Sequence, residues 1–185
     1  MTRWKRAGSV SLAVLAGASI LFVGLMLSSA SNTAQAQEDI RDQVLKNAEK
    51  LTAEGQKIFR YDTFGDQVFW GDTLKLHEAV KNVSPRTALA VGLKVDSEAL
   101  PANVRAALRN GQVNIDDPAV TQTLLKLNAV VGVTGIFDES GNLKSMGIQC
   151  ALCHSTVDNS LAPGIGRRQD GWPNRDLDVG TIISL

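Results

Sequence analysis

Cysteine and histidine are scarce in this chain of 185 residues, which contains two of each. A framework of several disulfide bonds is therefore excluded, because one pair of cysteines forms at most one bond. An excess of charge of either sign is also missing, since 19 lysines and arginines balance 19 acidic residues. A neutral chain lacks the basic face with which a general nucleic-acid-binding protein contacts phosphates. We therefore expect no nucleic acid among its partners.

The rest of the composition is that of a folded domain. Hydrophobic residues make up 44% of the chain and charged residues 21%, whereas disordered chains have fewer apolar residues and a larger net charge. The length suits one domain, or one domain preceded by a targeting segment.

The N-terminus has the pattern of an export signal. Met1–Arg6 carries three positive charges, an almost uninterrupted apolar run follows from Val10 to Leu27, and Ala34-Gln35-Ala36 has the form of a cleavage site. This order of features predicts a Sec-type signal peptide over residues 1–36. We therefore expect a periplasmic or secreted mature domain over residues 37–185.

An uncleaved membrane anchor is the alternative interpretation of the same segment. The apolar run reaches about 18 residues, the length at which a helix begins to span a bilayer. If the signal is cleaved, we expect no membrane contact in the mature protein. If it is retained, the domain stays tethered.

Hydrophobic spacing predicts a mainly helical domain. Trp70, Leu74 and His77 recur at helical intervals and predict one inward-facing side of a helix over Gln67–Lys81. Prolines suited to the first helical turn predict two further helices, over Pro101–Asn110 and Pro118–Leu127. Apolar residues on either side of a turn predict a β-hairpin formed by Val130–Phe137 and Leu143–Ile148.

The most specific pattern is Cys150-Ala151-Leu152-Cys153-His154, which has the spacing C-x-x-C-H. This spacing is the signature of covalent haem attachment. Two thiols one helical turn apart suit thioether bonds to the two vinyl groups of a haem, and the imidazole of the next residue then suits axial binding to iron. The sequence thus predicts a haem site at Cys150, Cys153 and His154, and assigns no catalytic residue.

The cysteine pair has three alternative uses besides haem attachment. A thioredoxin-like redox motif needs a βαβ context, which the hydrophobic pattern does not indicate. A zinc site needs four ligands, and beyond Cys150, Cys153 and His154 only His77 or a carboxylate is left. A plain disulfide bond remains compatible with an exported protein.

The surroundings of the motif resemble a known family. Gly55-Gln56-Lys57-Ile58-Phe59 is similar to the first helix of a cytochrome c, and Ala162–Arg167 to the proline-containing loop after its haem helix. Thr63-Phe64-Gly65-Asp66 and Asp170-Gly171-Trp172-Pro173-Asn174 are similar to bacterial exported c-type cytochromes. These relatives belong to the di-haem cytochrome c peroxidase-like group, and the likeness covers most of the predicted mature chain.

The resemblance implies a fold, a cofactor and one further contact. The implied fold is mainly α, a cytochrome c-like helical haem domain with the β-hairpin as a small insertion before the motif. The cofactor is one covalent haem c with its iron, and the carbonyl of Pro163 accepts a hydrogen bond from the ring of His154. Longer members of the group continue into a second haem domain, whereas this sequence ends at Leu185 and contains one motif. We therefore expect either a single-haem protein or a truncated member of the group.

Several functions fit a haem protein of this kind. An electron-transfer cytochrome exchanges electrons with a redox partner protein. The alternative is a haem enzyme of the cytochrome c peroxidase-like type, or a fragment or subunit of one, with an open distal site and an acid–base group. A gas sensor or an assembly subunit is a third hypothesis. The single motif and the long stretch between Gly55–Phe59 and Cys150 favour the electron carrier.

The second axial ligand follows by elimination. No methionine or histidine follows His154, two of the three methionines lie in the predicted signal, and Met146 lies on the proximal side, shortly before the motif. His77 is the remaining histidine. We therefore predict iron bound by His154 and His77, with a lower reduction potential than a His/Met site. Water, an open site or a lysine is the alternative at the distal position.

Overall fold

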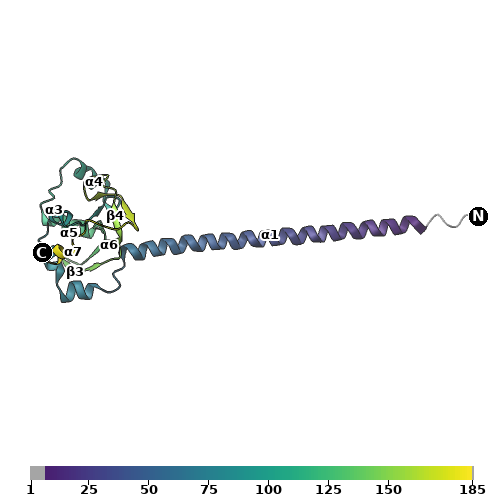
Figure 1. The fold of residues 1–185 in the computed structure, drawn as a ribbon, viewed down its shortest axis with the longest axis horizontal. Coiled ribbons are helices and arrows are strands. Elements are labelled where there is room, and N and C mark those ends of the chain that lie inside the picture. Colours follow the sequence, from purple (N-terminus) through teal and green to yellow (C-terminus); the bar gives the residue numbers. More distant parts are fainter. Residues whose placement is uncertain (1–6, 185) are drawn as a thin grey trace, which may run out of the picture. The chain divides into compact units, whose positions relative to one another are not determined.

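The computed structural model describes the backbone of residues 7–184. The chain divides into two compact units, Met1–Ala53 and Glu54–Leu185. Residues of helix α1 (Ala7–Tyr61), labelled in Figure 1, belong to both units. The charged segment 1–6 of the predicted signal lies outside the described residues, so the signal peptide stays a prediction.

The first unit contributes a helix without a core among its described side chains. Thr33 and residues 35–53 are all exposed, including the apolar Ile40, Val44 and Leu51. Within the part of the chain that is described, no helix has both the length and the hydropathy of a membrane span. The packed structure around the C-x-x-C-H motif belongs to the second unit.

The helix expected over Gln67–Lys81 is broken in two. A π-helix, η1 (Val68–Thr73), is followed by α2 (Leu76–Val80). Between them Lys75 adopts a left-handed conformation with φ of 52°, which ends the regular helical hydrogen bonding and turns the chain. The prediction of one continuous helix is therefore wrong.

The same break changes which side chains face inward. His77 is buried, as predicted, whereas Trp70 is half-buried and Leu74 is 50% exposed. The Trp70 indole N–H donates to Asp66 at 3.0 Å, and the carboxylate of Asp66 also accepts from the backbone N–H of Ile148 at 3.1 Å. Trp70 thus helps to fix the chain ahead of the C-x-x-C-H motif.

Three further helices begin where local signals place them. Helices α3 (Pro85–Ala90) and α5 (Pro118–Lys126) have proline in the first turn, and α4 (Ala102–Arg109) directly follows a proline. The carboxylate of Asp117 caps α5 by accepting from the backbone N–H of Ala119 at 2.9 Å. The predicted helices over 101–110 and 118–127 are confirmed to within one residue at each end.

The described residues form three two-stranded sheets. Strands β2 (Val133–Phe137) and β3 (Leu143–Ile148) pair as the predicted antiparallel hairpin. The other two sheets join distant segments, and their strands are β1 (Val95–Asp96) parallel to β5 (Ile165–Gly166), and β4 (Ser155–Val157) antiparallel to β6 (Arg168–Asp170). The short elements η2 (Ser97–Ala99), α6 (Ala151–His154) and α7 (Val179–Ser184) complete the unit.

The prediction of a mainly α, cytochrome c-like helical haem domain is wrong. The hairpin is not an insertion into a helical fold, because two more sheets flank the motif. Helix α6 has four residues and strand β4 follows at once. Thr156 and Val157 are β-branched residues, which favour strand over helix, and β6 supplies their hydrogen-bonding partner.

One hydrophobic core holds these short elements together. It lies between α5, the segment after it and the hairpin, and its buried members are Val95, Leu100, Leu124, Leu125, Ala129, Val130, Val133, Leu143, Met146 and Ile165. Leu152 of the C-x-x-C-H motif packs against this cluster. The core therefore positions the motif from its inner side.

Candidate functional site

The C-x-x-C-H motif forms a helical turn anchored directly after the hairpin. The backbone N–H of Gln149 donates to the carbonyl of Gly132 at 3.0 Å, and the Gln149 side-chain amide donates to the hydroxyl of Thr134. Helix α6 then runs from Ala151 to His154, with Cys150 as its N-terminal cap residue. Two contacts to β2 and its preceding loop thus fix the entry of the chain into the motif.

The burial pattern divides the motif into two faces. Ala151 is completely buried and Leu152 is half-buried, whereas Cys150, Cys153 and His154 are exposed. Residues three and four apart lie on the same side of a helical turn. Both thiols are free, so the motif presents two thiols and one imidazole on its outer face.

A close approach of two backbones fixes the inner face. Gly132 has φ of +82°, and a Cβ atom built on it would lie 2.1 Å from the Cα of Leu152. A side chain at position 132 would therefore overlap the motif helix and would also adopt a backbone conformation that residues other than glycine rarely occupy.

The segment after β6 closes over the end of α6. The backbone N–H of Gly171 donates to the carbonyl of His154 at 2.8 Å, and that of Asn174 donates to the carbonyl of Cys153 at 2.9 Å. These bonds satisfy carbonyls that the end of a helix leaves free. Trp172 lies between the two donors in the sequence, and its side chain is 65% exposed.

A charged cluster lies immediately beyond His154. The carboxylate of Asp170 accepts from the Ser155 hydroxyl at 2.9 Å, from Nε of Arg168 at 2.9 Å and from Nε of Arg60 at 2.6 Å. Ser155 is fully buried, and the Arg168 side chain is 2% exposed. Asp170 thus links strands β4 and β6 to the C-terminal end of α1.

The environment of Asp170 shifts its pKa. Burial alone raises the pKa, but hydrogen bonds from Arg60 and Ser155 and the charges of Arg168 and Arg60 outweigh it, so the pKa lies below its ordinary value of 3.8. A lowered folded-state pKa contributes stability that is present above the unfolded-state pKa and is lost as the pH falls through the folded-state pKa.

The first prediction concerns this pH dependence. In the wild-type protein the free energy of unfolding is expected to fall as the pH is lowered below about 4, because Asp170 becomes protonated there. Asp170→Asn is expected to lose about 2 kcal/mol at pH 7, the usual contribution of hydrogen bonds to a charged group, and to lose less on acidification. Urea unfolding of both proteins at several pH values measures this, and an equal acid loss in both would contradict the assignment.

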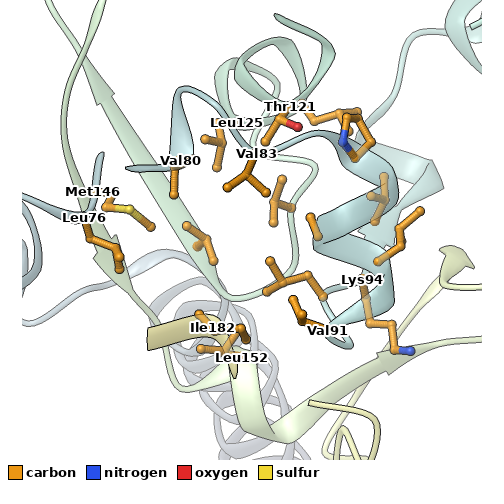
Figure 2. Close-up of a pocket in the computed structure, with 18 of the residues that line it drawn as sticks. Leu76, Val80, Val83, Val91, Lys94, Thr121, Leu125, Met146, Leu152 and Ile182 are labelled. Atoms are coloured by element: carbon orange, nitrogen blue, oxygen red, sulfur yellow. The ribbon is translucent and has the colours of Figure 1, made fainter. Parts of the chain in front are cut away.

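His77 is buried in α2. Its Nε2 lies 3.1 Å from a carboxylate oxygen of Glu78, while its Nδ1 is buried and has no hydrogen-bonding partner. Within the described residues no hydrogen bond joins His77 to His154. Their neighbours Leu76 and Leu152 do line one shared apolar cavity (Figure 2), so α2 and α6 stand at the walls of the same space.

Pro163 lies in an exposed turn before β5. The next residue, Gly164, donates its backbone N–H to the Asn159 side chain at 2.8 Å and accepts from the Val95 N–H at 2.9 Å. Among the residues that the structure describes, no hydrogen bond joins the ring of His154 to the Pro163 carbonyl. That contact stays an expectation from the resemblance.

Comparison of this chain with protein-family models, curated proteins and solved structures finds no match. In the described part of the chain, no three His, Cys, Asp or Glu side chains are grouped so as to hold a metal ion by themselves. The resemblance to exported cytochromes therefore rests on the quoted sequence segments alone.

The residues of α6 fit a covalently attached haem. Both thiols are free and exposed, and they share one face with the imidazole. The Asp170 cluster could not be predicted from the sequence, because it depends on contacts between Arg60, Ser155 and Asp170, which lie in separate elements.

Proposed function

We propose that this protein is an exported c-type cytochrome that carries one covalent haem and transfers electrons to or from a redox partner protein in the periplasm. Cys150 and Cys153 form the thioethers, and His154 is the proximal ligand. The observation that carries the proposal is the common outer face of α6, with two free thiols and an exposed imidazole and no other partner for either thiol.

The chain's residues have separate tasks in this proposal. The bound haem supplies an iron that changes reversibly between two oxidation states. The two thiols fix its position, and the His154 imidazole binds from the proximal side. The backbone bonds from Gly171 and Asn174 hold the end of α6.

The second prediction tests covalent attachment directly. The protein matured in a host that attaches haem to C-x-x-C-H motifs is expected to have the intact mass of the chain from Gln37 plus one haem. Acid–acetone extraction is expected to leave the haem on the polypeptide, because two thioethers hold it. Haem found entirely in the extract would refute the proposal, and a mass that still includes residues 1–36 would refute cleavage alone.

We further propose His77 as the distal ligand. Its buried Nδ1 has no partner, and buried polar atoms without a partner call for an explanation. The residue also follows a π-helix and the left-handed Lys75, and such irregularities concentrate at functional segments. Leu76 of α2 and Leu152 of the motif line the same apolar cavity, which places α2 on the inner side of α6.

The third prediction is the result of His77→Ala. The wild-type protein is expected to be low-spin, and the variant is expected to become high-spin and to bind carbon monoxide readily, because one axial position opens. Optical and EPR spectra measure both changes. Glu78→Gln is the control, since it changes the Nε2 neighbour but keeps the imidazole, and it should stay low-spin.

Two results would contradict bis-histidine ligation. An unchanged low-spin spectrum in His77→Ala would show that another residue occupies the distal position. A wild-type protein that is already high-spin and binds carbon monoxide at once would favour the alternative, a haem enzyme of the peroxidase-like type.

A further inference from the structure

An apolar cavity of about 100 Å³ lies inside the second unit (Figure 2). Aliphatic and thioether side chains from α2, α5, β3, α6 and α7 turn toward it, among them Leu76, Val80, Leu125, Met146, Leu152 and Ile182. The sequence analysis did not predict it, because these residues are spread over more than half of the unit.

Two polar residues border the cavity, and they differ in one respect. Lys94 directs its ammonium group to Asp176, at 2.6 Å. Thr121 of α5 is 6% exposed, and its hydroxyl oxygen is buried without any hydrogen-bonding partner. A buried hydroxyl that has lost water and gained no partner is unfavourable, and it marks a place where a partner is missing.

Water is a poor occupant of this space. A buried water molecule needs two to four polar partners, whereas apolar cavities stay dry and accept compact apolar molecules; an engineered cavity of roughly 150 Å³ holds benzene. Among the described side chains that line this cavity, the hydroxyl of Thr121 is the buried polar group without a hydrogen-bonding partner. The cavity is therefore suited to a molecule that is apolar over most of its surface and polar at one atom.

We propose that this cavity is a binding site for a small cyclic or branched molecule with one hydroxyl or carbonyl oxygen, which pairs with the hydroxyl of Thr121. The cavity volume of about 100 Å³ fits about four non-hydrogen atoms, by comparison with the larger cavity that holds benzene. Such a ligand contacts Leu152 between the two cysteines, so it touches α6 from the side opposite the thiols. The proposal does not depend on haem binding.

The test uses the full chain with methyl groups of Ile, Leu, Val and Met labelled for NMR. Propan-2-ol and 2-methylpropane are titrated separately, since both have four non-hydrogen atoms and the same branched shape, and they differ by a hydroxyl in place of a methyl group. Both are expected to shift the methyl signals of Val80, Leu152 and Ile182. Thr121→Val keeps the shape of the side chain and is expected to weaken propan-2-ol binding about fivefold, the usual value of one hydrogen bond, while 2-methylpropane binding is unchanged.

Two further variants separate the proposed contact from general effects on α5. Thr123→Val changes an exposed threonine whose hydroxyl already donates to the Ala119 carbonyl at 2.9 Å, and it should leave both affinities as in the wild type. Thr121→Ser keeps the hydroxyl, so it should keep the preference for propan-2-ol even if Thr121→Val fails to fold. Absence of any methyl shift with either compound, or equal affinities of Thr121→Val and wild type for propan-2-ol, would overturn the proposal.

Discussion

Replacing both Cys150 and Cys153 by alanine is expected to abolish covalent haem attachment completely. The intact mass should fall by one haem in addition to the two lost sulfur atoms, and any remaining haem should be released by acid–acetone. The reason is that the chain has no third cysteine to form a thioether. Replacing His154 by alanine should instead keep the haem mass and abolish the normal low-spin spectrum.

Leu152→Met is the matched control for these variants, because it changes the residue between the cysteines and conserves side-chain volume. It should keep both the haem mass and the low-spin spectrum. If the double cysteine variant still carried covalent haem, or if the His154 variant kept a normal spectrum, the assignment of the outer face of α6 would be wrong.

Gly132→Ala is expected to destabilise the protein by about 4 kcal/mol. About 1 kcal/mol of this comes from the strained backbone conformation, and about 3 kcal/mol comes from overpacking, because the new Cβ would lie 2.1 Å from the Leu152 Cα. Neither group can move aside alone, since both belong to the backbone. Denaturant unfolding monitored by tryptophan fluorescence measures the loss.

Gly65→Ala is the matched control for the close approach. Its φ of +84° is nearly that of Gly132, but nothing lies within 4 Å of the added Cβ. It should cost about 1 kcal/mol, the strain contribution alone. If the two variants cost the same, the contact between the loop before β2 and α6 would contribute nothing to stability.

Local signals allowed part of the fold to be predicted. Pro118 after Asp117 starts α5, because the ring of proline suits the first turn and the carboxylate caps it. The hairpin of β2 and β3 follows from apolar alternation around a turn. Each of these signals lies within about ten residues of the element that it predicts.

The fold class was wrong because it depends on pairings between distant segments. Strand β1 at Val95 pairs with β5 at Ile165, and β4 pairs with β6 across the Pro163 loop. Strands of two or three residues have no periodicity that a sequence pattern can display. The break at Lys75 was missed for a similar reason, since lysine carries no signal for a left-handed conformation.

In the candidate site, too, the features set by local sequence could be predicted and those set by contacts between separate elements could not. The common face of Cys150, Cys153 and His154 follows from helical spacing, and their exposure agrees with it. In the sequence, Asp170 stands out only within the segment Asp170–Asn174, which is similar to exported cytochromes. Its hydrogen bonds with Arg60 and Ser155 depend on the pairing of β4 with β6, which the sequence does not predict. The unpaired hydroxyl of Thr121 has no signature in the sequence at all.

The two free thiols on α6 impose a condition on maturation. Thiolates one helical turn apart and open to solvent react readily with oxidants and then with each other, forming a disulfide. Under the proposed function, such a disulfide would consume both sulfur atoms that haem attachment needs. Attachment and oxidation would then compete for the same pair, and the yield of holoprotein should depend on a reductant that keeps both thiols reduced until haem is attached.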